Sequence, residues 1–405
     1  VQTCALPIYD PASQVVDVRL RDGRHVLNTY DNLGRLTFQD RPAGELDWSA
    51  SYDLANRPTS IQDSGGTSVN YTYNALGQQL TETSTLGTFT KGYDVGGRLT
   101  QLTYPDGFYV NYDYDIAGYV TKIRENGATT GLGVLATYSY DNLGRRTAVT
   151  RGNGTSSSYS FDAVSRLTSL GHDLSGTAND LTIGSIAYNP ASQIQSQIKS
   201  NDAYAWGGHY NVNRNYTVNG LNQMITAGGT ALGYDGLGNL ITSGTNTYGY
   251  DSLNRLVSGP GTTLTYDPLD RLRQVVGASG TSKFGYSGSQ LLLETNGSGV
   301  LTKRYVAGPR VDEPVVWYEG SGTTDRRWLH ADERGSIVGV SDASGAMLAI
   351  NRYDEYGIPQ SSNAGRFGYT GQTWISELGM WNYKARFYSP TLGRFMQTDP
   401  IGYGD

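Results

Sequence analysis

The 405-residue chain carries a formal net charge of −6 at pH 7, and only 37% of its residues are hydrophobic. This acidic balance excludes the basic surface with which proteins bind nucleic acid or anionic membranes, so neither partner is expected. The 31 tyrosines, together with abundant Val, Ile, Leu and Thr, exclude a disordered chain and favour β-structure.

The N-terminal stretch, VQTCALPIYDPASQ, contains no initiating Met, no basic segment and no apolar segment, so it is not expected to be a signal peptide. We expect the sequence to be a piece of a longer protein. Cys4 is the single cysteine, so neither an internal disulfide nor a cysteine metal site is predicted. No apolar run of about 18 residues is present, and no membrane span is expected.

A Tyr-Asp pair recurs along the chain with a spacing that is mostly 20 to 22 residues and later becomes 16. The first series has its aromatic residue at Tyr9, Tyr30, Tyr52, Tyr73, Tyr93, Tyr114, Tyr140, Phe161 and Tyr188. The second series has it at Tyr234, Tyr250 and Tyr266, with degenerate copies that begin at Val218 and Tyr286. About fourteen copies cover residues 9 to about 300, which indicates a repeat architecture.

Each copy is predicted to be one β-hairpin. In YDNLGRLT (30–37), Tyr30 ends an incoming strand of period two, and Arg35 begins the outgoing strand. Asp31 is expected to cap the turn with its own carboxylate, and Gly34 to supply the positive φ that closes the loop.

The Asp and the Arg of this motif are interpreted as structural residues. The carboxylate caps the turn, and the guanidinium is expected to lie over a neighbouring Tyr ring. In YNALGQ (73–78) the charged pair is replaced by Asn and Gln, which a turn tolerates and a catalytic pair does not.

Fourteen hairpins would supply about 28 strands, whereas an open twisted sheet rarely exceeds about ten strands without curling. We therefore predict an all-β fold in which YD-repeat hairpins curl into a spiral, hollow shell. A wall made of one sheet has two broad faces, and neither requires a continuous dry core, which agrees with the low apolar content.

An aromatic-rich interval separates the two series of repeats. Between Tyr188 and Val218 the interval contains Tyr204, Trp206, Tyr210 and Tyr216. Two interpretations stay open: these rings pack within the wall, or they form a bulge that binds a sugar or a protein.

The four histidines are isolated in the sequence and show no spacing typical of metal ligands. They are His25, His172, His209 and His330. The segment His330-Ala331-Asp332 is interpreted as a strand-edge motif, and neither a metal nor a cofactor is predicted.

The repeats YDNLGRLT (30–37), YDVGGRLT (93–100) and YDSLNRLV (250–257) resemble the YD repeats of the Rhs family, which the C component of insecticidal Tc toxins and teneurins share. Residues 328–360 and 365–405 resemble the Rhs-repeat-associated core. Its ordered motifs are GSIVGVSDASG, RYDEYG, GYTGQ, ARFYSP, GRFMQTDP and IG.

The resemblance divides the chain into a YD-repeat β-shell, residues 1–302, and a core domain, residues 303–405, that is truncated at its C-terminal end. It implies a hollow shell that the core segment closes at one end. The shell holds a variable C-terminal polypeptide, often a toxin.

The resemblance also implies an aspartyl autoprotease that releases the C-terminal polypeptide. The family's Arg matches Arg386 in KARFYSP, and the first Asp of its DPxG motif matches Asp399 in TDPIG. Two carboxylates that share a proton activate water, and a nearby guanidinium tunes them. The family's second Asp follows further downstream, so the sequence holds half of the protease, and Asp405 is not assigned to it.

Structural roles remain open for both residues. Asp399 precedes a proline, an arrangement that often opens a turn. Arg386 has a structural alternative in packing against Phe387, Tyr388 or Trp381.

Our first functional expectation is an encapsulating shell of a bacterial Rhs-type polymorphic toxin, secreted or at the cell surface. Its partners would be its own C-terminal toxin cargo and the proteins of a secretion or delivery system. One alternative is a teneurin-like or cell-wall adhesion module that binds carbohydrate or protein. The other is the aspartyl autoprotease, which is incomplete here, so no enzymatic activity is expected from the chain as given.

Overall fold

The computed structural model describes residues 6–209 and 214–399, which form 38 β-strands and four short 3-10 helices with no α-helix among them. The chain divides into two compact units, each built from segments that are separated in sequence. Unit 1 comprises Val1–Thr88, Tyr210–Gly285 and Ile375–Asp405, and unit 2 comprises Phe89–His209 and Tyr286–Trp374. The boundary predicted from the sequence, at 302/303, separates the repeats from the core segment. It does not correspond to the division into compact units and stays a prediction.

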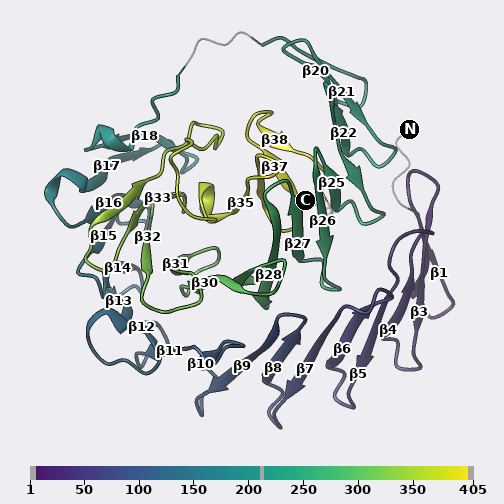
Figure 1. Cartoon of the computed structure of the whole chain (residues 1–405), viewed down its shortest axis with the longest axis horizontal. Helices are drawn as coiled ribbons and strands as arrows, with labels where there is room; N and C mark the ends of the chain where they lie inside the picture. Colours follow the sequence, from purple (N-terminus) through teal and green to yellow (C-terminus); the bar gives the residue numbers. More distant parts are fainter. Residues whose placement is uncertain (1–5, 210–213, 400–405) are drawn as a thin grey trace. The chain divides into compact units, whose positions relative to one another are not determined.

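Unit 1 contains three groups of antiparallel strands (Figure 1). Within each group a strand pairs with the next, except that β23 and β24 of the second group belong to different sheets. The first group is β1 (Leu6–Tyr9), β2 (Val15–Arg19), β3 (His25–Tyr30), β4 (Leu36–Asp40), β5 (Trp48–Tyr52), β6 (Pro58–Asp63), β7 (Ser68–Tyr73) and β8 (Gln79–Ser84). The second group is β19 (Tyr216–Val218), β20 (Met224–Ala227), β21 (Thr230–Tyr234), β22 (Leu240–Ser243), β23 (Asn246–Thr247), β24 (Gly249–Tyr250), β25 (Leu256–Gly259), β26 (Thr262–Tyr266), β27 (Leu272–Gly277) and β28 (Gly280–Ser287). The third group is β36 (Met380–Asn382), β37 (Phe387–Ser389) and β38 (Arg394–Phe395).

Unit 2 repeats this organisation with two long groups of strands. The first group is β9 (Gly87–Tyr93), β10 (Leu99–Thr103), β11 (Tyr109–Tyr114), β12 (Val120–Glu125), β13 (Val134–Tyr140), β14 (Arg146–Arg151), β15 (Ser156–Phe161), β16 (Leu167–Asp173), β17 (Leu181–Tyr188) and β18 (Ile194–Lys199). The second group is β29 (Gln290–Asn296), β30 (Leu301–Ala307), β31 (Pro314–Glu319), β32 (Arg326–Ala331), β33 (Ile337–Ser341) and β34 (Met347–Ile350), followed by β35 (Thr373–Ile375). The 3-10 helices are η1 (Gly131–Gly133), η2 (Thr177–Asn179), η3 (Asp202–Tyr204) and η4 (Tyr369–Gly371).

The Tyr-Asp motif forms the corner of a hairpin, as predicted. Between β3 and β4, the N–H of Gly34 donates to the carbonyl oxygen of Asp31 at 2.9 Å, and Oδ1 of Asp31 accepts from the N–H groups of Leu33 and Arg35. Gly34 has a φ of 79°, which is the left-handed conformation that the turn needs. Nε of Arg35 donates to Oδ2 of Asp31 at 2.7 Å, and this hydrogen bond holds the pKa of the Asp31 carboxyl below its usual range.

The same corner also binds the next repeat through two contacts. The guanidinium of Arg35 lies over the ring of Tyr52, 4.8 Å from its centroid, which confirms the predicted cation–π contact. In the opposite direction, the hydroxyl of Tyr52 donates to the carbonyl oxygen of Leu36 at 2.7 Å. The ring contact recurs at other corners: Arg57 over Tyr73, Arg98 over Tyr114, Arg145 over Phe161, Arg166 over Tyr188 and Arg255 over Tyr266. The motif therefore shapes one hairpin and fastens the next one to it.

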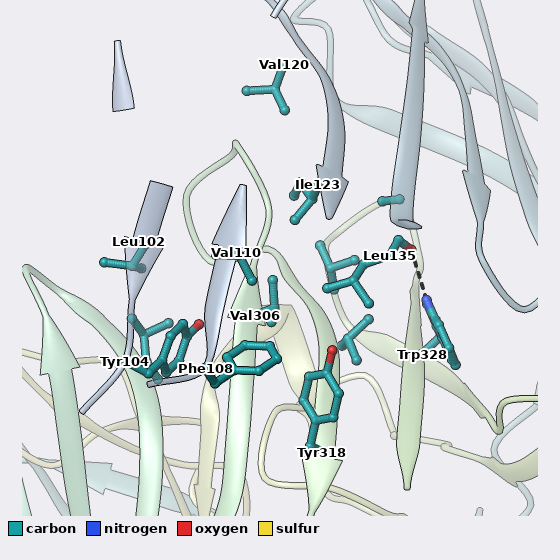
Figure 2. Packing of buried hydrophobic residues seen from close by; sticks show 14 of the residues in the cluster. Leu102, Tyr104, Phe108, Val110, Val120, Ile123, Leu135, Val306, Tyr318 and Trp328 are labelled. Atoms are coloured by element: carbon teal, nitrogen blue, oxygen red, sulfur yellow. Dashed lines mark hydrogen bonds between the residues drawn. The ribbon is translucent and has the colours of Figure 1, made fainter. Parts of the chain in front are cut away.

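A dry apolar core lies inside unit 2, and here the structure differs from the one-layer wall that the composition suggested. Side chains from β9–β14, such as Val110, Ile123 and Leu135, pack against Val306, Tyr318 and Trp328 from β30–β32 (Figure 2). Nε1 of Trp328 donates to the carbonyl oxygen of Leu135 at 2.9 Å. The reason is that both groups of strands carry apolar residues that pack against each other, and β31 is buried at every position but its last. Each fully buried Val or Leu stabilises the fold by about 1.5–3 kcal/mol.

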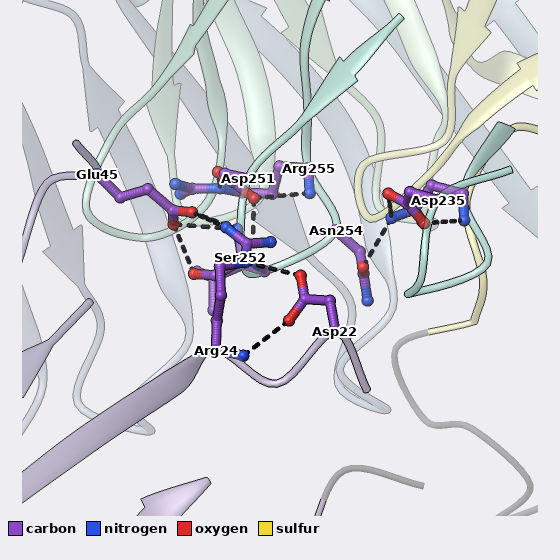
Figure 3. A network of polar contacts seen from close by, with 10 residues as sticks. Asp22, Arg24, Glu45, Asp235, Asp251, Ser252, Asn254 and Arg255 are labelled. Carbon is purple, nitrogen blue, oxygen red and sulfur yellow. Dashed lines mark hydrogen bonds and ion pairs between the residues drawn. The ribbon is translucent and has the colours of Figure 1, made fainter. Parts of the chain in front are cut away.

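Charged and polar contacts join the strand groups of unit 1. Glu45, in the loop between β4 and β5, accepts hydrogen bonds from the backbone N–H and the hydroxyl of Ser252, in a corner of the second group (Figure 3). Arg24 donates to the same carboxylate at 2.7 Å. Glu82, whose side chain is only 1% exposed, pairs with Arg271 at 2.6 Å. Loops and strands of the first group thus hold the corners of the second group in place.

Candidate functional site

The backbone around Arg386 forms a tight connection between β36 and β37. Within it, the N–H of Tyr383 donates to the carbonyl oxygen of Arg386 at 2.9 Å, and Lys384 adopts a positive φ of 67°. The N–H of Lys384 donates to the side-chain oxygen of Asn382 at 2.9 Å. The neighbouring Phe387 is buried, so the start of β37 is fixed and Arg386 is held at its edge.

Asp399 lies in the segment that follows β38, and this segment is attached to a repeat corner in unit 1. The carbonyl oxygen of Met396 accepts from the N–H of Leu240 at 2.9 Å. The N–H of Thr398 donates to the side-chain oxygen of Asn239 at 3.4 Å. Asn239 is fully buried and also donates to Asp235, the capping residue of its own corner. The corner therefore positions the residue directly before Asp399.

The structure brings Arg386 and Asp399 together. Nη2 of Arg386 lies 2.7 Å from Oδ2 of Asp399, and the two side chains are 26% and 31% exposed. The guanidinium also lies over the ring of Phe395, 4.0 Å from its centroid. Phe395 is not among the rings named from the sequence, and packing of Arg386 against Phe387, Tyr388 or Trp381 stays a prediction. The ion pair holds the side chain of Asp399 in place beside Arg386.

Some residues named from the sequence lie outside the described residues. They are Cys4, Tyr210, Asp405 and the end of TDPIG from Pro400 onward. The two residues assigned to the protease, Arg386 and Asp399, are both described, and their catalytic role stays a prediction.

Two histidines that are isolated in the sequence meet in the folded chain. In unit 2, the rings of His172 and His330 lie 5.6 Å apart between centroids, and both side chains are buried. Nδ1 of His172 lies 2.8 Å from the hydroxyl of Ser157, and Nε2 of His330 lies 2.8 Å from that of Ser341. Burial, with a smaller effect of the Arg151 charge, lowers the pKa of His172 to about 3. Their separation by more than 150 residues hides the pair from any local pattern.

Among residues 6–209 and 214–399, no group of three or more His, Cys, Asp or Glu side chains is placed to hold a metal ion. Within the same part of the chain, no helix is long and apolar enough to cross a membrane.

Comparison with known proteins gives matches of three kinds. The family model described as RHS Repeat matches residues 52–88 and 73–109. The tRNA3(Ser)-specific nuclease WapA of Bacillus spizizenii is 30% identical over 137 residues, which is 32% of this chain and 6% of that protein. The tRNA nuclease WapA of Bacillus subtilis is 28% identical over 137 residues, with the same shares. This chain therefore spans a small part of the length of these relatives.

The crystal structure of TcdB2-TccC3-TEV matches over 99% of this chain and 27% of that chain, with a TM-score of 0.64 and 16% sequence identity. At this identity the likeness shows the fold alone. It agrees with the hairpin series described above, and the predicted fold class, an all-β shell of YD-repeat hairpins, is confirmed.

Proposed function

We propose, since this chain is an Rhs/YD-repeat protein, that it forms the encapsulating shell of a bacterial Rhs-type toxin and encloses a C-terminal toxin polypeptide. The observation that carries the proposal is a pair of contacts between successive repeats. The guanidinium of Arg35 lies over the ring of Tyr52 in the next repeat, and the hydroxyl of Tyr52 donates to the carbonyl oxygen of Leu36. Because such contacts recur along the chain, they favour a continuous wall of hairpins, whereas a local binding site would require them at one corner only.

The relatives support the same proposal without supplying an activity. The WapA proteins are named as tRNA nucleases, but the aligned stretch is 6% of their length, so their nuclease activity is not assigned to this chain. We therefore propose that the matched repeats enclose a different segment of the protein, and that this segment carries the activity. The shell would be secreted or presented at the bacterial surface, and its partners would be its cargo and the proteins that deliver it.

Enclosure can be tested by comparing how a small and a large thiol reagent label a cysteine in the cargo. The protein is the full reading frame that contains this chain, with every native cysteine, Cys4 included, changed to Ser and one new cysteine placed in its C-terminal polypeptide. Enclosure predicts that a small maleimide labels the native protein and that a 5-kDa polyethylene glycol maleimide labels it only after denaturation. Equal labelling of the native protein by both reagents would contradict enclosure.

Within this shell, we assign Asp399 and Arg386 to an aspartyl autoprotease that a second Asp, further along the full protein, completes. A carboxylate takes a proton from water, the water oxygen attacks the peptide carbonyl, the C–N bond breaks, and the leaving nitrogen takes up a proton. Arg386 would hold Asp399 in place, in keeping with their separation of 2.7 Å.

The protease assignment has a separate test in the same full-length protein. Asp399→Asn is expected to abolish the cleavage that releases the C-terminal polypeptide, followed by gel electrophoresis and mass spectrometry. Asp53→Asn is the matched control, because it removes a carboxylate charge at a repeat corner and keeps the oxygen that caps the turn. Unchanged cleavage in Asp399→Asn would refute the catalytic role while leaving the enclosure proposal intact.

A further inference from the structure

The corner between β21 and β22 departs from the repeat motif at its last residue. Its sequence, residues 234–239, is YDGLGN, so Asn239 stands where YDNLGR, residues 30–35, has Arg35. The guanidinium of Arg35 lies over the ring of Tyr52 in the next repeat. An asparagine side chain is too short to reach the next ring in this way, so Asn239 makes other contacts.

The amide of Asn239 differs from a guanidinium because it carries an acceptor as well as donors. Nδ2 donates to Oδ2 of Asp235 at 3.0 Å and to Oδ1 of Asn254, in the next corner, at 2.9 Å. These two hydrogen bonds stabilise the corner and link it to the next repeat. Oδ1 of the same amide accepts from the N–H of Thr398 at 3.4 Å. Arginine has five N–H donors and no acceptor, so it could make the first two contacts and could not accept from Thr398.

Two further features of this corner fit the segment that follows β38. The N–H of Leu240 donates to the carbonyl oxygen of Met396 at 2.9 Å, and the hydroxyl of Thr398 donates to the carbonyl oxygen of Leu237 at 3.4 Å. Gly238 has a φ of 90°, and a Cβ atom on it would lie only 2.8 Å from Cγ2 of Thr398. The glycine therefore leaves the space that the threonine methyl group occupies.

Burial also distinguishes this corner from the ordinary ones. Asn239 is fully buried, and Leu237 is 6% exposed. Leu33 and Leu143, at the matching position of two other corners, are both 69% exposed. The tip that other repeats present to solvent is thus covered here, and it contacts Thr398, the residue before Asp399.

We propose that Asn239 is a positioning residue of the autoprotease, which acts through Thr398 to place the carboxylate of Asp399. This inference rests on the proposed function of Asp399 and adds a residue of the repeats, 159 positions before Thr398, to the same site. Arg386 holds the side chain of Asp399, and Asn239 holds the backbone that precedes it. A displaced carboxylate would no longer be aligned with the water molecule and the peptide that it acts on.

Two substitutions at this position separate positioning from stability. Asn239→Arg restores a donor to Asp235, as Arg35 donates to Asp31, and removes the acceptor for Thr398. Asn239→Asp keeps the size of the side chain and the acceptor, but it loses both donors and places a second carboxylate beside Asp235. The urea midpoint of the 405-residue chain is therefore expected to be lower in Asn239→Asp than in Asn239→Arg.

Cleavage is expected to follow the opposite order. The full reading frame that contains this chain is synthesised in a cell-free system, and release of the C-terminal polypeptide is timed by gel electrophoresis. Asn239→Arg is expected to cleave about tenfold more slowly than the unchanged protein, and Asn239→Asp within about threefold of it. A residue that served stability alone would give cleavage rates in the same order as the urea midpoints.

Two control variants place the same new residues at a corner outside the site. Gln78→Arg changes the matching position of the corner between β7 and β8, where Gln78 forms hydrogen bonds with Asn74. Gly77→Ala is the control for Gly238→Ala, because Gly77 has a φ of 84° and a Cβ on it would lie 3.7 Å from the nearest atom, Nη1 of Arg57. Both controls are expected to cleave as the unchanged protein does, and Gly238→Ala more slowly.

Hydrogen exchange in the 405-residue chain measures the docking of residues 396–399 independently of cleavage. Exchange of the Thr398 N–H is expected to be faster in Asn239→Arg and unchanged in Gln78→Arg. Unchanged exchange in Asn239→Arg, or cleavage as fast as in the unchanged protein, overturns the positioning role and leaves the protease assignment to the Asp399→Asn test. Cleavage that persists in Asp399→Asn refutes the protease and the positioning role together.

Discussion

Acidification is predicted to destabilise unit 2 through its two buried histidines. His172 is held between the hydroxyl of Ser157, at 2.8 Å, and the carbonyl oxygen of Ala331, at 3.1 Å, and it faces the second histidine, His330. Burial and then the charge of Arg151 lower the pKa of both imidazoles, that of His172 to about 3. Both rings are therefore neutral in the folded protein at pH 7.

The size of the effect follows from the difference between the folded and unfolded pKa values. An imidazole in the unfolded chain has a pKa of about 6.5. Because the unfolded state binds the proton more tightly, the stability contributed by His172 is complete above that pH and is lost as the pH falls toward 3. Between pH 8 and pH 5, the free energy of unfolding drops by about 2 kcal/mol for His172, and the lowered pKa of His330 adds to this loss in the same direction.

Asp332 acts in the opposite direction. Burial, followed by the charge of Glu333, raises the pKa of the Asp332 carboxyl to about 6. Its stabilising effect is complete at low pH and is lost as the pH rises through 6, so acidification from pH 8 to pH 5 restores about 1 kcal/mol. The two histidines still dominate this interval.

The assay is urea denaturation at pH 8 and pH 5, in the unchanged chain and in His172→Gln, followed by tryptophan fluorescence. Glutamine keeps a hydrogen-bonding group and cannot take up a proton at these pH values. The loss of unfolding free energy between the two pH values is expected to be smaller by about 2 kcal/mol in the variant. Because the comparison uses the change in unfolding free energy between the two pH values, any destabilisation by the substitution that does not depend on pH cancels.

Leu76→Gln is the control, because Leu76 is 81% exposed and the substitution introduces the same residue at a position without a titratable group. It is expected to leave the pH dependence of the unchanged chain intact. If His172→Gln loses as much stability on acidification as the unchanged chain, the reasoning about the buried pair is wrong.

Three further predictions concern the repeat corners and share one measurement, the urea midpoint of the chain. Tyr52→Phe removes the hydroxyl that donates to Leu36 and is expected to cost about 1 kcal/mol; no change would show that the back-bond does not contribute. Gly34→Ala places a Cβ on a residue with a φ of 79° and is expected to cost about 1–2 kcal/mol, so an unchanged midpoint would contradict the strained turn. Leu54→Asn, at a corner tip that is 105% exposed, is expected to stay within about 0.5 kcal/mol, and a larger loss would reveal an unrecognised contact.

The hairpin corners could be predicted from the sequence because every part of the motif acts locally. Asp31 caps a loop that ends four residues later, and Gly34 is the residue whose φ the loop requires. The contact between Arg35 and the next Tyr ring was also predictable, since the repeat places the two in register. The hydroxyl bond of Tyr52 to Leu36 was missed, because it depends on the stagger of adjacent hairpins.

The two-layer core of unit 2 could not be predicted from the repeat pattern. It depends on β9–β14 packing against strands that follow about 150 to 200 residues later, such as the contact of Leu135 with Trp328. Period-two alternation shows that one face of a strand is apolar and does not show which strand covers it. The expectation of a single layer followed from the low hydrophobic content of the whole chain. That content combines exposed hairpin corners with a buried core, so it does not show that the core exists.

The candidate sites show the same limit. Arg386 and Asp399 were found by motif and lie 2.7 Å apart, whereas the ring of Phe395 beside the guanidinium was not named from the sequence. The hydrogen bond from Gln197 to Glu333 could not be predicted, because the two residues are 136 positions apart in sequence and meet only in the folded chain.

Limited proteolysis of the full reading frame that contains this chain tests the central proposal, the enclosed cargo, most directly. The native protein and a urea-denatured sample are digested with a broad-specificity protease, and the C-terminal polypeptide is followed by mass spectrometry. An enclosing shell predicts that this polypeptide stays intact in the native protein and is degraded rapidly in urea. Degradation at the same rate in both samples would contradict enclosure.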